Sequence, residues 1–158
     1  MKRKKIIKIA AILVIAGLVI GGAIGLYLFN MPKRDIQNAK TDFSVTSSAL
    51  VAEYLTDQKA ANQKYLAADG ESKILEVAGT VSKISENFNG QKVVLLKDNS
   101  DKAGVSATFT EETAGQVSSI QVGQSIRVKG VIRSGAAYDQ DLGLYEHVIL
   151  EKSAIINE

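Results

Sequence analysis

The sequence contains no cysteine, and only one proline and one histidine occur among its 158 residues. Without Cys the protein can have no disulfide framework, no thiolate metal site and no thiol nucleophile. A lipid cannot be attached at an N-terminal Cys either, so we do not expect a lipoprotein. His147 has no partner in a nucleophile–base pair that the sequence identifies, so we expect no enzyme activity and no cofactor.

Basic residues are concentrated at the N-terminal end. Five of the 19 bases fall within residues 1–8, which contain no acid. Residues 9–158 therefore hold 14 bases against 17 acids, a net charge of −3. A mildly acidic domain lacks the basic surface on which nucleic-acid binding depends, so nucleic acid is not the expected partner.

An uncharged run of 21 residues, Ile9 to Phe29, follows this basic tip. As a helix it would be about 32 Å long, enough to cross a hydrocarbon core of about 30 Å. More bases precede the run than follow it, so its N-terminal side should stay in the cytoplasm. We therefore predict a single-pass helix (9–29) in the inner, cytoplasmic membrane. The remaining domain should be periplasmic or otherwise extracytoplasmic.

Two alternatives for this segment stay open. Residues 23–25 (AIG) form a small-x-small triplet that a signal peptidase could accept, so the segment could be a cleaved signal sequence. Gly17, Gly21 and Gly25 are spaced four residues apart on one helix face, which could let two copies pack closely as a homodimer.

The residues after the span predict a linker and then a helix. Residues 30–43 contain Pro32, which cannot continue the helical hydrogen bonds, and we expect a juxtamembrane linker there. Over residues 44–69 apolar side chains, Tyr54 and Tyr65 among them, recur at helical spacing and predict one amphipathic helix. Thr46 is a candidate N-cap, and Gly70 suits the C′ position. The helix is expected to pack on the following domain or to present an interaction surface.

After Gly70 the apolar period changes from 3.6 to 2, which predicts strands. Gly79 suggests a bulge or bend within the first strand, and Asn89-Gly90 signals a hairpin. A short helix opens at residues 110–113. The predicted strands cover 74–84, 92–97, 104–109, 125–133 and 144–156.

The order β-β-β-α-β-β is the layout of an OB barrel. We therefore predict a mainly β fold, a five-stranded OB-fold Greek-key barrel over residues 73–156 with an inserted short helix. The amphipathic helix and the N-terminal transmembrane helix precede it. An SH3-like barrel is the nearest competitor, but it lacks an inserted helix of this kind.

Three short stretches resemble the bacterial tRNA-anti-like OB-fold family over about residues 48–156. Residues 60–65 (AANQKY) match an Ala-x-x-Lys-Tyr helix end, residues 75–84 match a Leu-Glu-Val-x-Gly-x-Val-x-x-Ile strand, and residues 123–130 match Gly-Gln-x-Ile-x-Val-x-Gly. The resemblance implies the OB fold, while the family's biochemical function is largely undefined. Other members often carry Cys in the last strand, about where Ser153 stands here.

OB barrels usually bind on the face of their second and third strands, flanked by the first and fourth inter-strand loops. Phe109 could stack there or belong to the core. The acids of the two loops, Asp98 and Asp101 in one and Asp139, Asp141 and Glu146 in the other, lack EF-hand spacing, so we expect no metal site. The candidate binding residues of this face and rim are Phe88, Lys92, Lys97, Tyr138 and His147.

These features favour a membrane-anchored, extracytoplasmic binding or scaffold module. Its partner would be an envelope protein or a glycan, met at the loop rim or along the helix at Tyr54 and Tyr65. The alternative function is oligonucleotide binding by a barrel that faces the cytoplasm. One or two stacking residues on a net-acidic domain are few for that purpose.

Overall fold

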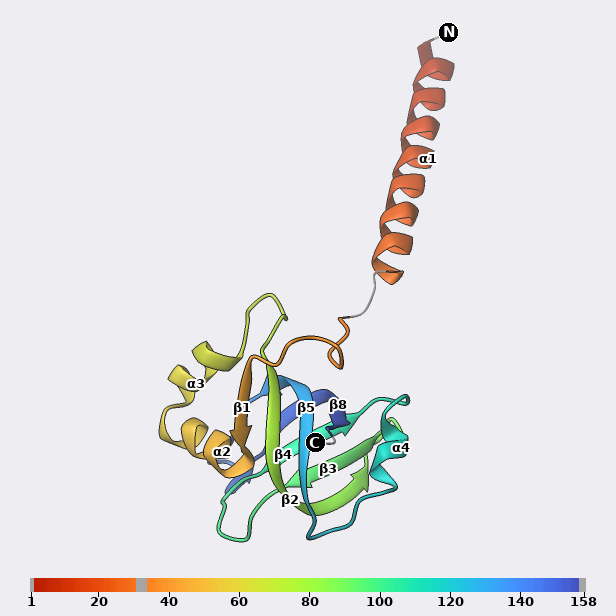
Figure 1. Ribbon diagram of the computed structural model, residues 1–158. Helices are drawn as coiled ribbons and strands as arrows, with labels where there is room; N and C mark the ends of the chain where they lie inside the picture. Colours follow the sequence, from red (N-terminus) through yellow and green to blue (C-terminus); the bar gives the residue numbers. More distant parts are fainter. Residues whose placement is uncertain (1, 31–33, 157–158) are drawn as a thin grey trace. The chain divides into compact units, whose positions relative to one another are not determined.

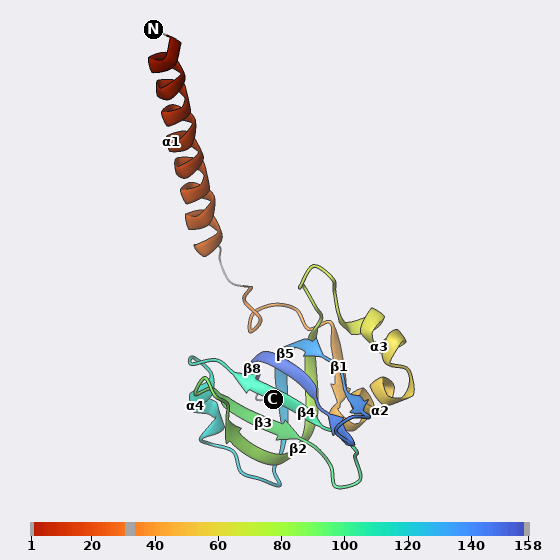
Figure 2. The same ribbon diagram turned by 180° about the vertical axis from the view of Figure 1, so that it is seen from behind.

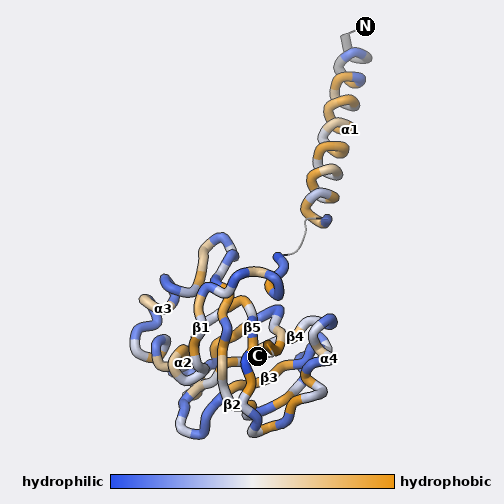
Figure 3. The backbone as a smooth tube through the Cα atoms, in the orientation of Figure 1, coloured by the Kyte–Doolittle hydropathy of each residue, from blue (hydrophilic) through white to orange (hydrophobic). Residues whose placement is uncertain are grey.

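The structure, a computed structural model, describes residues 2–30 and 34–156, and the chain divides into two compact units, residues 1–34 and 35–158. The first unit contains α1 (Lys2–Phe29), whose apolar residues cover most of its length (Figure 3). Side chains such as Leu13 and Phe29 are exposed. Within the described residues, Ile7–Phe29 is the stretch long and apolar enough to cross a membrane, at about 35 Å. A signal sequence would meet the same criterion.

A closed five-stranded barrel forms the centre of the second unit (Figure 1). Its strands follow the order β2-β3-β4-β8-β5, and β5 pairs with β2 to close the ring. Neighbouring strands are antiparallel except β4 and β8, which run parallel, as in a Greek key. The predicted OB-fold barrel is confirmed. The strands are β2 (Ile74–Glu86), β3 (Lys92–Leu96), β4 (Val105–Phe109), β5 (Ser125–Ser134) and β8 (Val148–Ile155).

The alternating pattern of the strands fills the interior of the barrel with apolar side chains. In β4 and β5 every second residue is buried, because successive side chains point to opposite faces of a strand. Phe109 is fully buried, so it belongs to the core and not to a binding face. Short helix α4 (Ala114–Val117) contributes the buried Val117 and lies on the side of the barrel opposite α2 and α3 (Figure 2).

Strand β2 is long because it pairs with different partners along its two halves. Residues 74–80 pair with β5, residues 81–86 pair with β3, and the register shifts between Val81 and Lys83. The predicted bend therefore lies just beyond Gly79. Gly79 itself permits a close approach, because a Cβ there would lie 2.6 Å from Ser47 Oγ.

The predicted single helix over residues 44–69 is wrong in its detail. A short strand β1 (Phe43–Thr46) runs parallel to β2, followed by helices α2 (Ser47–Thr56) and α3 (Gln58–Tyr65). Thr46 is the N-cap of α2, as predicted, and its side chain accepts a hydrogen bond from Ala49 N. Asp57 separates the two helices, because its non-helical backbone ends α2 while its side chain caps α3 by accepting from Ala60 N. Gly70 has φ +83° but lies in the following loop and does not cap a helix.

The expected linker over residues 30–43 is in part fixed to the barrel. Residues 31–33, with the predicted helix-ending Pro32, lie outside the described residues. Ile36 is buried, and Lys129 Nζ donates hydrogen bonds to the carbonyl oxygens of Gln37 and Ala39. Asp42 N donates to Ile74 O, and Asp42 Oδ2 accepts from Ile74 N. These contacts join residues 36–42 to β2 and β5.

The predicted last strand, 144–156, and the loop before it contain an additional hairpin. Strands β6 (Ala137–Asp139) and β7 (Leu144–Glu146) pair with each other in a separate two-stranded sheet, and β8 begins only after His147. Asp139 Oδ1 accepts hydrogen bonds from the backbone nitrogens of Asp141 and Leu142, and Gly143 takes φ +66°. This β6–β7 hairpin is an addition to the barrel within the connection from β5 to β8.

Candidate functional site

The five predicted binding residues lie in two groups at opposite ends of β3. Phe88 belongs to the turn between β2 and β3, and Lys92 is the first residue of β3. Lys97, Tyr138 and His147 belong to the β3–β4 loop and to the long connection between β5 and β8. These two loops meet where Gly104 N donates a hydrogen bond to His147 Nδ1 over 3.0 Å.

The turn between β2 and β3 is stabilised by interactions among its own residues and the strand ends beside it. Asn87 Oδ1 accepts hydrogen bonds from the backbone nitrogens of Asn89 and Gln91, and Gly90 takes φ +77°. Lys92 forms a 2.7 Å ion pair with Glu86 across the hairpin. Phe88 is fully exposed at the tip. A single exposed ring is weak evidence for a ligand site.

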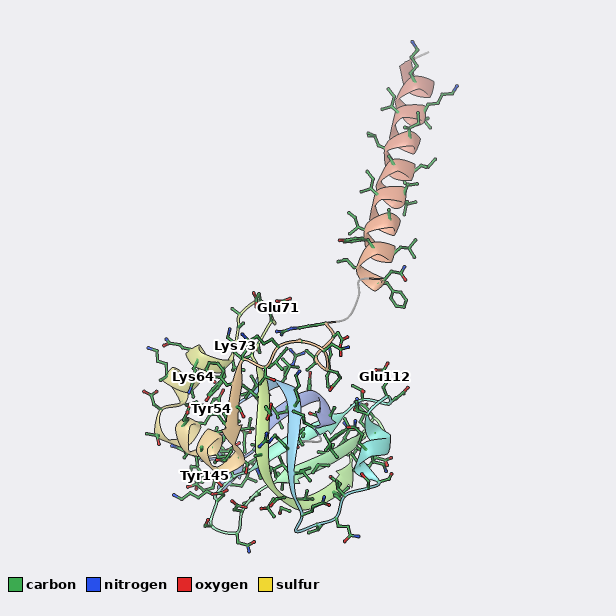
Figure 4. The ribbon with its side chains drawn as sticks, viewed as in Figure 1. Tyr54, Lys64, Glu71, Lys73, Glu112 and Tyr145 are labelled. Carbon is green, nitrogen blue, oxygen red and sulfur yellow. The ribbon has the colours of Figure 1, made fainter. Side chains whose placement is uncertain are left out.

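The other end of β3 carries a pocket of about 310 Å³, which we call the tyrosine pocket. Its residues come from α2 and the start of α3, from the β3–β4 loop, and from the segment that leads into and forms the β6–β7 hairpin, so three separated parts of the chain converge on it. The rings of Tyr138 and Tyr145 are 4.8 Å apart and tilted by 50°. Two of its tyrosines, Tyr54 of α2 and Tyr145 of β7, are labelled in Figure 4. The lining residues are Tyr54, Leu55, Gln58, Lys102, Ala136, Ala137, Tyr138 and Tyr145.

Tyr54 is the most tightly held of the three tyrosines. Its ring stacks on Tyr65 at 6.0 Å, and a Cβ on Gly135 would lie only 1.8 Å from Tyr54 Cε1. Only a glycine therefore allows the chain after β5 to cross this ring. Burial raises the pKa of Tyr54 to about 12, and the neighbouring Tyr65 and Glu53 add to the rise. The buried Tyr54 hydroxyl has no hydrogen-bond partner among the described residues.

Tyr65 is fully buried and cannot meet a partner, contrary to the prediction that it forms part of an interaction surface. Its hydroxyl donates to Glu53 Oε2 over 2.9 Å, and Lys64 Nζ donates to both oxygens of the same carboxylate. The hydrogen bond from Lys64, followed by that from Tyr65, lowers the pKa of Glu53. The Ala-x-x-Lys-Tyr helix end thus joins α3 to α2. Its tyrosine, Tyr65, stacks on Tyr54, which lines the pocket.

The β3–β4 loop that carries Lys102 is fixed on two sides. Ser48 Oγ, in the first turn of α2, donates to Asp101 Oδ2 over 2.6 Å and lies 3.1 Å from Asp98 Oδ2. His147 holds the far end of the loop through Gly104. Lys102 Nζ then lies over the Tyr145 ring, 5.5 Å from its centroid, at a cation–π distance.

His147 acts as a hydrogen-bond acceptor through Nδ1, which requires the neutral imidazole with its proton on Nε2. Partial burial lowers the pKa of His147, and the nearby positive charge of Lys97 lowers it further. His147 therefore helps to fix the loop through its hydrogen bond to Gly104, and Lys97 lies close enough to act on its charge. Neither lines the tyrosine pocket.

The outer face of β3 and β4, where many OB barrels bind, has little that marks a ligand site. Its partly exposed residues pair across the strands as Val93 with Thr108 and Leu95 with Ser106. No aromatic side chain stands among these outward positions of the described β3 and β4. Base stacking, the main sequence-tolerant contact to single strands, has no platform on them.

The acidic loop residues hold backbone and hydroxyl groups of the protein. Asp98 and Asp101 accept from Ser48, and Asp139 accepts from the backbone of its own turn. Over residues 2–30 and 34–156 no group of three His, Cys, Asp or Glu side chains is placed to hold a metal ion. Ser153 lies in the core and is closely packed, since a Cβ on Gly130 would come within 2.8 Å of its Oγ.

A larger and shallower groove of about 630 Å³ runs between the start of α2, β2 and β5. Ser47, Gly79 and Ile126 are among its lining residues. Its one arginine, Arg127, forms a 3.1 Å ion pair with Glu76. The groove contains none of the predicted site residues and no ring. The tyrosine pocket is therefore the better candidate.

Sequence reasoning found Tyr138 and missed Lys102, Tyr145 and the role of Tyr54 in this pocket. The available signal was the recurrence of Tyr at two positions seven residues apart, 138 and 145, on either side of a Gly-containing turn. Pairing of β6 with β7 places these two residues directly opposite each other. The position of Tyr54 beside these two residues depends on tertiary packing, and no local sequence pattern predicts it.

Comparison with known proteins agrees with the fold. A crystal structure of a Klebsiella pneumoniae lipoprotein, for which nucleic-acid binding is proposed, superposes with a TM-score of 0.52 at 17% sequence identity. The match covers 72% of this chain and 91% of that one, and at this identity it shows the fold alone. No curated protein matches the sequence. The family model for tRNA-anti-like proteins matches residues 1–141, so the chain belongs to the tRNA-anti-like family.

Proposed function

We propose that this protein is a non-enzymatic binding module, anchored by α1 in the cytoplasmic membrane with its barrel on the outer side. Its partner is an envelope protein or a glycan that contacts the tyrosine pocket. The observation that carries the proposal is the convergence of α2, the β3–β4 loop and the β6–β7 hairpin on one aromatic pocket.

Two further features support this proposal. The basic tip before an apolar stretch of 23 residues favours a cytoplasmic N-terminus. The barrel unit, residues 35–158, holds 12 bases and 17 acids, a net charge of −5. A negative domain is suited to a neutral or basic partner and is repelled by polyanions.

Oligonucleotide binding is the second candidate, because it is proposed for the structurally similar Klebsiella lipoprotein. Against it stand the net negative charge of the barrel unit and the outer face of β3 and β4, whose described outward residues include no ring. A fluorescence-anisotropy titration with single-stranded DNA and RNA separates the two functions. We expect no binding at physiological salt, since few phosphates could be neutralised.

Photo-crosslinking in intact cells tests the main proposal. A photoreactive phenylalanine derivative replaces Tyr138 in the pocket, Phe88 at the remote tip, or the exposed Glu112 beside α4. We expect a discrete adduct from position 138 and none from positions 88 and 112. Equal adducts from all three positions, or none from 138, would contradict the proposed site. Alkaline phosphatase fused to the C-terminus should be active, and an inactive fusion would contradict the topology.

A further inference from the structure

The tyrosine pocket already contains one positive charge of the protein itself. Lys102 Nζ lies 5.5 Å from the centroid of the Tyr145 ring, within the range over which a cation is attracted to the π face. Tyr138 presents a second ring, with its centroid 4.8 Å from that of the first, and Tyr138 as a residue is 50% exposed. The pocket thus offers two ring faces at an angle, of which Lys102 covers one.

Lys102 is a replaceable occupant of this position. Its side chain is exposed, and within the described residues its ammonium forms no ion pair. The contact with Tyr145 is therefore the principal interaction that keeps the ammonium near the pocket. An exposed cation–π contact is weak, so a competing cation can displace it.

The charge around the pocket favours a cationic ligand. Residues 134–151 include four acids, Asp139, Asp141, Glu146 and Glu151, and no Lys or Arg. Arg133 lies 3.5 Å from Glu151, which leaves the three acids on the hairpin without an ion pair among the described residues. These acids do not line the pocket but belong to the hairpin that carries its two rings. Their charge repels a phosphate or carboxylate that approaches the pocket and attracts an ammonium or guanidinium group.

The lining also suits the apolar part of a long basic side chain. Leu55, Ala136 and Ala137 line the pocket beside the rings, and a volume of about 310 Å³ accommodates one such side chain. Lysine and arginine bury their methylene groups along apolar surface while the charged end stays near polar groups. Gln58 offers one amide to the neighbouring backbone of a partner.

We infer that the tyrosine pocket binds a lysine or arginine side chain of a protein partner, and that Lys102 occupies the cation position in the free protein. This inference rests on the proposed function and narrows its partner from protein or glycan to a protein with an exposed basic side chain. Binding exchanges one cation over Tyr145 for another, so Lys102 acts as a competitor of the ligand.

The test measures ring resonances of the full chain in phosphatidylcholine nanodiscs. The protein is labelled with 3-fluorotyrosine, and the ¹⁹F signals of Tyr138 and Tyr145 are assigned by Tyr→Phe substitution. The three probes are the capped tripeptide Ala-Lys-Ala, the matched Ala-Glu-Ala and the neutral disaccharide N,N′-diacetylchitobiose. We expect the lysine peptide to shift both signals and the other two probes to leave them unchanged.

The decisive variant is Lys102→Met, which keeps the length of the side chain and removes its charge. Loss of the competitor should increase the affinity for the lysine peptide about twofold to fivefold, the range of an exposed cation–π contact. The matched control Lys83→Met, an exposed lysine on β2, should leave the affinity unchanged.

Weaker or unchanged binding in Lys102→Met would overturn the inference, as would preferred binding of the glutamate peptide or the disaccharide. If any of these results is found while cross-linking from position 138 in cells is retained, the cationic ligand is rejected and the proposed function still stands. A failure of cross-linking in cells rejects the proposed function itself.

Discussion

The two ends of β3 show how differently aromatic residues can be presented on one barrel. At the β2–β3 turn Phe88 stands alone and exposed, above a turn that satisfies its own hydrogen bonds. At the opposite end Tyr138 and Tyr145 lie against each other, in a pocket built from three segments. An exposed ring is thus a poor indicator of a site, whereas a ring held by distant segments has a defined geometry that a ligand can use.

The largest expected effect comes from Gly135→Ala at the pocket end. The new Cβ would lie 1.8 Å from Tyr54 Cε1, so either the ring or the chain after β5 must move. We expect a loss of about 3 kcal/mol in the free energy of unfolding, measured by urea denaturation. The control at the other end is Gly90→Ala, which only strains a residue with φ +77° and should cost about 1 kcal/mol. Equal losses would remove the contrast between the two ends.

A second comparison concerns the two stacked tyrosines behind the pocket. Tyr65→Phe removes a hydrogen bond to the ionised Glu53 and should cost about 1.5 kcal/mol of unfolding free energy. Tyr54→Phe removes a buried hydroxyl that has no partner among the described residues, so it should be neutral or stabilise by about 1 kcal/mol. If Tyr54→Phe destabilises the protein as much as Tyr65→Phe does, the Tyr54 hydroxyl has a bound partner, and a water or ligand there should be sought.

A smaller effect is expected from pH at His147. Its pKa is lowered in the folded protein, so the unfolded chain binds the proton more readily. Stability should therefore be constant above the unfolded value of about 6.5 and fall as the pH decreases from there toward the folded pKa. Thermal unfolding between pH 7.5 and 4.5 measures the decrease. His147→Gln keeps an acceptor for Gly104 N and should reduce the decrease, while an unchanged profile would assign it to other groups.

The smallest effect should follow from Phe88→Ala at the tip. The side chain is fully exposed, so we expect a change below about 0.5 kcal/mol in the free energy of unfolding. Removal of the exposed ion pair by Lys92→Ala should likewise cost less than about 1 kcal/mol. A larger loss in urea denaturation for either variant would show that the tip contacts more of the protein than its own turn.

The sequence was sufficient to predict those helices and strands whose residue pattern is long and lies within one segment of the chain. Alternation over β5 and the Gly79 signal in β2 predicted the barrel strands, and Thr46 marked the start of α2. Strands β1, β6 and β7 have three or four residues, too few for a period of 2 to be recognised. The helix break at Asp57 was missed because apolar spacing continues across it, although Asp is a favoured cap.

The site was predicted less completely than the fold, for a different reason. Tyr138 was identified because it stands in a polar, Gly-containing loop, where rings are conspicuous. The contact between Tyr54 and Gly135 joins positions that are distant in the sequence, and no local pattern records it. Lys102 lies in a loop whose position is determined by Ser48 and His147, two residues that also lie far from it in the chain.

The close packing of Gly135 against the Tyr54 ring has a consequence for the order in which the protein folds. About eighty residues separate these two positions, and β4 and β8 pair in parallel only after most of the chain is present. Contacts of such sequence separation form slowly, because a long loop must close before they add stability. We therefore expect the tyrosine pocket to form late in folding. A partner that binds the pocket would then distinguish the mature protein from a chain that is still folding.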